Sequence, residues 1–148
     1  MTLPVVAVER LIAADPQPIF DVLANPEMHP VIDGSGSVKE IRSSDARLHQ
    51  GSRFGASMRI VVPYRVVNRV VEFEDGRRIA WRHWAGHRWR YVLTPTDAGT
   101  LVREEWDATR LPAWGQWALK VTATPARNRR GMERTLVRLE ALVAGTPR

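Results

Sequence analysis

Four polar residues that could do acid–base chemistry stand at alternate positions within apolar, strand-like segments of this 148-residue chain. They are Asn68, His83, Tyr91 and Glu104. Because successive side chains of a strand point to opposite faces, each of the four shares a face with apolar neighbours and should point inward. Burying a polar group costs free energy unless it is hydrogen-bonded, so we expect all four to have partners there.

His83 and Glu104 are the candidate catalytic residues. A histidine titrates near neutral pH and can act as a general acid or base, and a nearby glutamate could orient its ring. Proton abstraction from an activated carbon, with polar groups holding the carbonyls, is most of what a cyclisation needs. The structural alternative is a satisfied polar pair in the core, or a histidine exposed at the end of a strand.

The other histidines are weaker candidates. His29 falls where a short helix should meet the sheet, and it could be a site residue or a surface loop residue. His87 sits in a turn beside Gly86, and we expect both His87 and His49 to be solvated.

The chain carries no metal-binding or nucleotide-binding motif. Cysteine is absent, and no His-x-x-x-His pair or Gly-x-Ser-x-Gly elbow occurs. The loop at 33–37 lacks the carboxylates of a calcium site and the Gly-Lys pair of a phosphate-binding loop. We therefore expect no metal and no cofactor. Gly34 and Gly36 should permit a tight turn, which could act as a mobile gate at a pocket mouth.

Strands must position most of these residues. Alternating apolar and Arg-bearing positions with short turns between them predict an antiparallel meander with one buried face. A β-branched run at Val5–Ile12 supplies a further strand near the beginning of the chain. The six strands of the meander are expected at residues 38–42, 53–62, 64–73, 79–84, 88–93 and 100–106.

Helical patterns flank the meander. Asp15-Pro16 starts a short helix that must stop near Asn25-Pro26, and Glu27–Val31 could add one more turn. A connecting region at 111–125 has a helical face of Trp114, Trp117, Ala118 and Val121. Thr124-Pro125 then signals the start of a long helix that ends at Gly145. Its apolar stripe is Met132, Leu136, Leu139 and Val143.

Strand alternation predicts which residues face the interior if the Arg-rich faces are outside. A register slip of one residue would reverse any strand, and valines on both faces leave 64–73 undetermined. The expected inward set is Phe54, Ala56, Met58, Ile60, Tyr64, Val66, Asn68, Val70, Ile79, Trp81, His83, Trp89, Tyr91, Leu93, Val102, Glu104 and Trp106.

All six tryptophans fall between Trp81 and Trp117. Stacked aromatic rings suit a flat hydrophobic ligand such as a polyketide or sterol, although the same rings could simply fill the core. A sheet with one long helix across it leaves a concave space of the kind that binds ligands. The candidate ligand-binding residues are Phe54, Met58, Tyr64, Asn68, Trp81, Trp89, Tyr91, Trp106, Trp117, Met132 and Leu136.

Over nearly its whole length the sequence resembles the START/Bet v 1-like (SRPBCC) superfamily, and within it the polyketide cyclase/dehydrase group. The resemblance rests on the order and spacing of segments 13–23, 25–30, 73–81, 93–100 and 132–139. It implies one domain over 1–148 with an α+β helix-grip fold. In that fold a curved antiparallel sheet of about seven strands wraps a long C-terminal helix, and two short helices follow the first strand. It does not imply one activity, since the superfamily includes cyclases, lipid carriers, receptors and co-chaperones.

The net charge of +6 raises the question of nucleic-acid binding, because residues 120–148 hold seven basic and only two acidic side chains. We interpret this charge instead as the solvated face of the last helix, so nucleic acid is not the expected partner. No apolar run is long enough to span a bilayer, and the first residues lack the pattern of a signal peptide. We therefore expect a cytoplasmic protein.

Three functions remain open. The first is binding of a small hydrophobic molecule with catalysis of a polyketide-type cyclisation, and the second is a non-catalytic carrier or sensor of lipid-like ligands. A catalyst should lose turnover but keep ligand affinity when His83 or Glu104 is replaced. The third, a nucleic-acid module, should bind with steep salt dependence. A homodimer could form through an exposed sheet edge or the Trp114–Trp117 region.

Overall fold

A computed structural model describes residues 5–59, 61–83 and 86–144 of the chain. Three predicted features lie outside the described residues: inward-facing Ile60, the strand end at Trp84 and the helix end at Gly145. The elements in chain order are β1 (Val6–Ile12), α1 (Pro16–Leu23), the 3-10 turn η1 (Pro26–Met28), α2 (His29–Ile32), β2 (Val38–Ser43), β3 (Arg53–Arg59), β4 (Pro63–Glu74), β5 (Arg78–His83), β6 (Arg88–Thr96), β7 (Gly99–Asp107), α3 (Ala113–Val121) and α4 (Thr124–Ala144).

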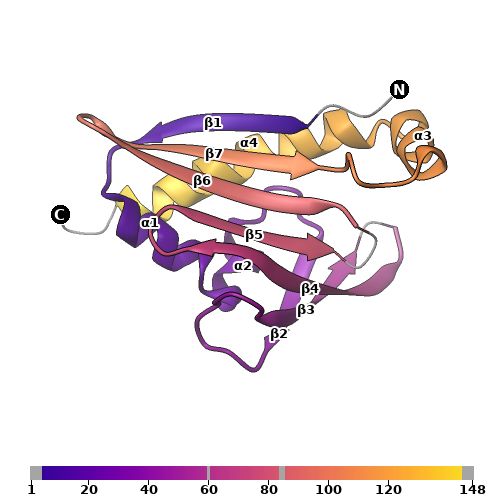
Figure 1. The fold of residues 1–148 in the computed structure, drawn as a ribbon, viewed down its shortest axis with the longest axis horizontal. Coiled ribbons are helices and arrows are strands. Elements are labelled where there is room, and N and C mark those ends of the chain that lie inside the picture. Colours follow the sequence, from indigo (N-terminus) through magenta and orange to yellow (C-terminus); the bar gives the residue numbers. More distant parts are fainter. Residues whose placement is uncertain (1–4, 60, 84–85, 145–148) are drawn as a thin grey trace.

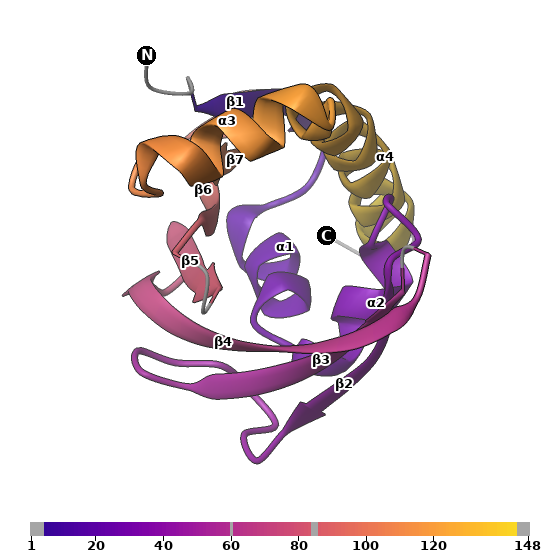
Figure 2. The same cartoon turned by 90° about the vertical axis from the view of Figure 1, so that its right-hand side faces the viewer.

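The strands form one antiparallel sheet in the order β1-β7-β6-β5-β4-β3-β2. The sheet curves strongly, and α4 crosses its concave side from the β1 edge (Figure 1). Seen from the α3 end, sheet, α4 and α2 form a ring with α1 at its far end (Figure 2). The predicted helix-grip architecture is therefore confirmed, with seven strands, the long last helix and short helices after β1.

Strand alternation places the inner face as the sequence predicts. In β7, for example, Val102, Glu104 and Trp106 are buried while their neighbours are only partly so. The undetermined strand β4 turns Val66, Asn68 and Val70 inward. Its pairing with β5 shifts between Val70 and Glu72, and beyond this bulge the alternation changes phase, so that Glu72 faces outward and Phe73 packs against Phe20.

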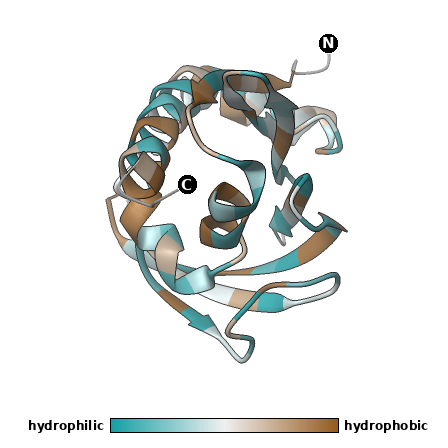
Figure 3. Cartoon of the chain, turned by 90° about the vertical axis from the view of Figure 1, so that its left-hand side faces the viewer, coloured by the Kyte–Doolittle hydropathy of each residue, from teal (hydrophilic) through white to brown (hydrophobic). Residues whose placement is uncertain are grey.

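A solid core fills the end of the ring that holds α1. Ile19, Phe20 and Leu23 of α1 are completely buried, because the helix lies inside the curve of the sheet. Figure 3 shows these hydrophobic turns facing the C-terminal half of α4. Leu139 and Val143 of α4 belong to the same core cluster. No helix of the described residues fills the opposite end of the ring in this way, and a cavity remains there beside the N-terminal half of α4.

Helix α3 is buried on a different face from the one that carries its tryptophans. Its buried residue is Gln116, whose amide donates hydrogen bonds to the backbone oxygens of Thr109 (3.3 Å) and Leu111 (2.8 Å). Trp114, Trp117 and Val121, which belong to the helical face predicted from sequence, are exposed. The most apolar face of this helix is therefore not its buried face.

The loop between α2 and β2 is attached to α4. The Gly34 amide donates to Thr135 Oγ1 at 2.9 Å, and a Cβ at Gly34 would collide with the backbone oxygen of Gly131. Asp33 fixes the loop internally by accepting from the backbone amides of Ser35 (3.1 Å) and Val38 (2.9 Å). These contacts attach the loop to α4 and fix its internal turn in this structure. The described part of the chain has no helix that is both long and apolar enough to cross a membrane.

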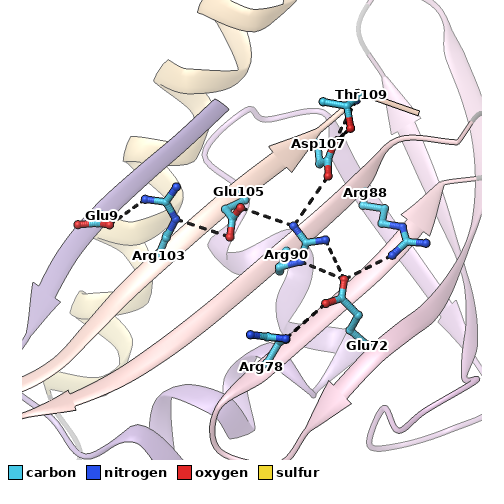
Figure 4. A network of polar contacts seen from close by, with 9 residues as sticks. All are labelled: Glu9, Glu72, Arg78, Arg88, Arg90, Arg103, Glu105, Asp107 and Thr109. Carbon is cyan, nitrogen blue, oxygen red and sulfur yellow. Dashed lines mark hydrogen bonds and ion pairs between the residues drawn. The ribbon is translucent and has the colours of Figure 1, made fainter. Parts of the chain in front are cut away.

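A network of ion pairs covers the outer face of the sheet (Figure 4). Glu72 is at its centre, with its carboxylate 2.8 Å from Arg90, 3.5 Å from Arg88 and 3.8 Å from Arg78. Partial burial would raise the pKa of Glu72, but the hydrogen bonds and charges of these arginines outweigh it and the pKa is lowered. Ion pairs therefore connect β4, β5 and β6 on the solvent-facing side of the sheet.

Replacing Glu72 with glutamine should destabilise the protein at neutral pH by about 1 kcal/mol, because Arg90 and Arg88 lose a shared partner. A lowered carboxyl pKa stabilises the fold above the unfolded value and ceases to do so as pH falls through the folded value. Urea unfolding at several pH values should therefore show the difference shrinking in acid. Glu74→Gln, which disturbs only the exposed Arg77 pair, is the matched control. Equal effects of the two substitutions would contradict a special role for the network.

Candidate functional site

A cavity of about 840 Å³ lies between the inner face of the sheet, the N-terminal half of α4 and the loop that follows α2. This volume falls within the range typical of small-molecule sites. The site residues predicted from sequence that line it are Phe54, Met58, Tyr64, Asn68, Trp81, His83, Trp89, Tyr91, Glu104, Trp106 and Met132. They come from β3 to β7 and α4, and the alternation of the strands brings them together.

Two predicted ligand-binding residues lie elsewhere. Trp117 is 66% exposed on the outer face of α3, and Leu119 is the α3 residue that lines the cavity. Leu136 is 1% exposed and belongs to the core cluster. Met132 lies one turn nearer the start of α4 and reaches the cavity, whereas Leu136 lies where the core begins. The apolar stripe of α4 therefore contributes to the cavity at Met132 and to the core at Leu136.

Glu104 and Tyr91 form a buried polar pair on adjacent strands, where they face each other across β6 and β7. The Tyr91 hydroxyl donates to Glu104 Oε1 at 2.9 Å. Glu104 is only 2% exposed, and its other oxygen, Oε2, has no hydrogen-bond partner among the described residues. The carboxyl group expected to orient His83 is instead bound to Tyr91, and it keeps one oxygen uncommitted in the cavity wall.

Burial raises the pKa of Glu104 to about 8. The hydrogen bond from Tyr91 opposes that rise, and the negative charge of Asp33 adds to it. The pKa of Tyr91 is also well above its ordinary value, because of burial and then of Glu104. At neutral pH Glu104 is therefore mostly a neutral carboxylic acid that accepts one hydrogen bond and can donate another.

His29 is a buried cavity residue and not the surface residue that was the alternative. Its ring stacks on Trp81, with centroids 4.8 Å apart, and meets the edge of Phe54 at 5.3 Å. Nε2 lies 2.8 Å from the backbone oxygen of Leu23, so this nitrogen carries the proton. Burial lowers the pKa of His29 to about 4, and the ring is thus neutral and fixed as part of the aromatic wall.

His83 and His87 stack on each other, with ring centroids 4.5 Å apart and planes 12° from parallel. The expectation of a solvated His87 was wrong, because its backbone oxygen accepts from the His83 amide at 2.9 Å and its ring lines the cavity beside that of His83. Burial lowers the pKa of both rings, that of His87 to about 4, where His83 contributes further. His83 therefore offers the cavity a neutral imidazole at neutral pH.

The cavity thus joins an apolar aromatic wall to a neutral acid and neutral imidazoles. It can hold an apolar molecule and donate a hydrogen bond to an acceptor on it, and an imidazole can accept a proton. Within the described ranges, no three histidines or carboxylates are grouped closely enough to hold a metal ion.

Sequence reasoning missed a set of cationic residues in the cavity lining. Arg127, Arg130 and Arg134 of α4 were assigned to solvent alone, yet they border the cavity as well. Lys39 and Arg59 border it from β2 and β3. In the sequence these cations resemble those of any solvent-exposed element, and they border the cavity only because the curved sheet and α4 come together in the fold.

Residues 4–144 match the model of a protein family described as polyketide cyclase/dehydrase and lipid transport. An uncharacterised Mycobacterium tuberculosis protein, Rv0088, is 31% identical over 132 residues. The match covers 86% of this chain and 59% of that protein, so the chain spans well under two thirds of the relative's length.

Several solved structures share the fold. The KanY protein superposes with a TM-score of 0.77 at 15% identity, covering 98% of this chain and all of that one. Protein CV1439 from Chromobacterium violaceum gives 0.70 at 15% identity, with 95% and 98% covered. An AHSA1-like protein from Aeromonas hydrophila gives 0.68 at 16% identity, with 95% and 92% covered.

Proposed function

Because the chain belongs to the polyketide cyclase/dehydrase and lipid transport family, we propose that it binds a small, largely apolar molecule in the cavity between the sheet and α4. The ligand carries a hydrogen-bond acceptor such as a carbonyl. The observation that carries the proposal is the free Oε2 of Glu104, a buried acid oxygen in the wall of an aromatic cavity. An acceptor on the ligand would satisfy it.

The aromatic wall supports the shape of the ligand. Trp81, His29 and Phe54 pack as one rigid group, with the Phe54 and Trp81 rings at 5.6 Å, and the Trp89 and Trp106 rings lie 6.4 Å apart on β6 and β7. Flat faces of this kind favour a planar or ring-containing molecule over a flexible one, because a rigid ligand loses little conformational entropy when it stacks on side chains that are already ordered.

A catalytic function is the second candidate, and a separate observation favours it. Glu104 is an acid at neutral pH, and His83 is a neutral imidazole in the same cavity. An acid that polarises a carbonyl and a base that takes a proton from the adjacent carbon are the parts of a cyclisation or dehydration. Without turnover, the same residues make a carrier or sensor.

Filling the cavity tests binding directly. The Ala56→Trp substitution places an indole on the inner face between Ile41 and Val66, which flank Ala56 in the sheet and also line the cavity. We expect the affinity for N-phenylnaphthylamine, an uncharged fluorescent aromatic amine, to fall about tenfold or more, because the indole occupies space that the ligand would otherwise fill. Fluorescence titration measures it.

Ser57→Trp is the matched control, since Ser57 is the next residue and points to the other face of β3. It should leave the affinity within about twofold, and thermal unfolding should show that both variants fold. Unchanged binding in Ala56→Trp, or an equal loss in Ser57→Trp, would overturn the cavity as the binding site.

A further inference from the structure

Five cationic side chains line the cavity where α4 approaches the β2–β3 edge of the sheet. The sheet does not close on itself, since β1 and β2 are its two edge strands, and Figure 2 shows α2 between α4 and the β2–β3 side of the sheet. The loop after α2 connects the two sides, because the Gly34 amide donates to Thr135 of α4 and the Arg59 amide of β3 donates to the Ser37 backbone oxygen at 2.8 Å. The five cations are Lys39, Arg59, Arg127, Arg130 and Arg134.

Little negative charge in the cavity lining balances these cations. Asp33 carries one negative charge, and its carboxylate accepts hydrogen bonds from Ser35 and the Val38 amide, while Glu104 is mostly neutral. The five cations therefore outnumber the one carboxylate charge in the lining. None of the five cations takes part in an ion pair with another residue in the described part of the chain. The part of the cavity lining that holds these five residues is therefore a positively charged border beside an apolar interior.

Tyr64 connects this border to the aromatic wall. Tyr64 of β4 and Arg127 at the start of α4 both line the cavity, so these two elements border the same space. Tyr64 lines the same cavity as Trp81 and Tyr91. A molecule whose apolar body reaches Glu104 would thus leave its other end among the arginines.

We propose that the border formed by Lys39, Arg59, Arg127, Arg130 and Arg134 is a subsite for an anionic group, so that the natural ligand is an amphiphile with a carboxylate, sulfate or phosphate. This inference rests on the proposed function, because it places the apolar body of the same ligand in the cavity. Arginine is suited to such groups, since its planar guanidinium can donate two parallel hydrogen bonds to them.

Two fluorescent probes separate the subsite from the cavity. Anilinonaphthalene sulfonate and N-phenylnaphthylamine share one aromatic skeleton, and only the first carries an anionic group. We expect the double substitution Arg127→Gln/Arg130→Gln to weaken sulfonate binding about tenfold and to leave the uncharged probe within about twofold. Raising the salt from about 50 to 500 mM should weaken the sulfonate alone, because exposed charges are screened.

Arg69→Gln/Arg82→Gln is the matched control. These two arginines are exposed and are paired in register on the outer face of β4 and β5, and they are not among the residues that line the cavity. The control removes the same charge and should change neither affinity. Sulfonate binding that is unchanged in Arg127→Gln/Arg130→Gln, or reduced equally in the control, would overturn the subsite while uncharged-probe binding upholds the cavity. Failure of both probes to bind would overturn the proposed function and the subsite with it.

Discussion

Replacing Glu104 with glutamine should make the protein more stable at neutral pH, whereas the same change at the next residue, Glu105, should make it less stable. Glu104 faces the cavity and has its pKa raised to about 8, mainly by burial. Glu105 faces outward and is 3.5 Å from Arg90 and 3.6 Å from Arg103. Two adjacent glutamates should therefore respond with opposite signs.

The sign for Glu104 follows from proton linkage. Between the ordinary value of 4.5 and about 8, the folded protein holds a proton that the unfolded chain releases, so stability falls as pH rises through this window and levels off above it. At pH 7 the cost is on the order of 3 kcal/mol, at about 1.4 kcal/mol for each pKa unit. A glutamine avoids it but buries an extra N–H, so we expect a net gain of about 2 kcal/mol.

Urea unfolding of wild type, Glu104→Gln and Glu105→Gln between acid and alkaline pH measures these differences. The gain in Glu104→Gln should be absent near pH 4, grow through neutrality and reach a plateau above pH 8. A Glu104→Gln protein that is less stable than wild type at pH 7 would show that Glu104 is ionised in the fold. In that case the Glu104 side chain would stabilise the fold, and it would not be a site residue that is retained at a cost to stability.

Binding of a neutral aromatic ketone should weaken above pH 8 in wild type and stay constant in Glu104→Gln. Prodan, a fluorescent naphthyl ketone, has a flat apolar body and one carbonyl. Protonated Glu104 can donate to that carbonyl, whereas the ionised form only accepts and would repel it. Each pH unit above the pKa should lower the affinity about tenfold, because the protonated fraction falls in that proportion.

Three other titratable groups of the cavity change their protonation outside this pH window. The pKa of Tyr91 is well above its ordinary value, and those of His83 and His87 are below theirs. Glutamine retains an N–H donor at every pH, so Glu104→Gln is both the variant and the control. Prodan fluorescence titrations from pH 6 to pH 10 measure the affinities. An equal loss in both proteins would assign the effect to another group and remove Glu104 from the site.

Much of this fold could be predicted from the chain because period-two alternation is enforced over many residues. Arginine on alternate positions of the strands marks the wet face, and so Phe54, Trp81, Tyr91 and Glu104 were expected inside by exclusion. The bulge after Val70 is a local departure that alternation alone does not locate.

Other parts of the site depend on packing between distant segments. Trp117 and Leu136 both lie on apolar helical stripes, yet one faces solvent and the other lies in the core beside α1. His87 reaches the cavity because its backbone pairs with that of His83, which brings the two rings together. The bond between Tyr91 and Glu104 depends on the β6–β7 register, which residue types do not state.

The crystal structure of the protein with prodan bound is the most direct test of the central claim, that the cavity holds an apolar ligand through the acid of Glu104. We predict the naphthalene ring beside Trp81 and the carbonyl oxygen within about 3 Å of Glu104 Oε2. Prodan bound instead on the exposed tryptophans of α3, or held in the cavity with its carbonyl turned away from Glu104, would contradict the claim.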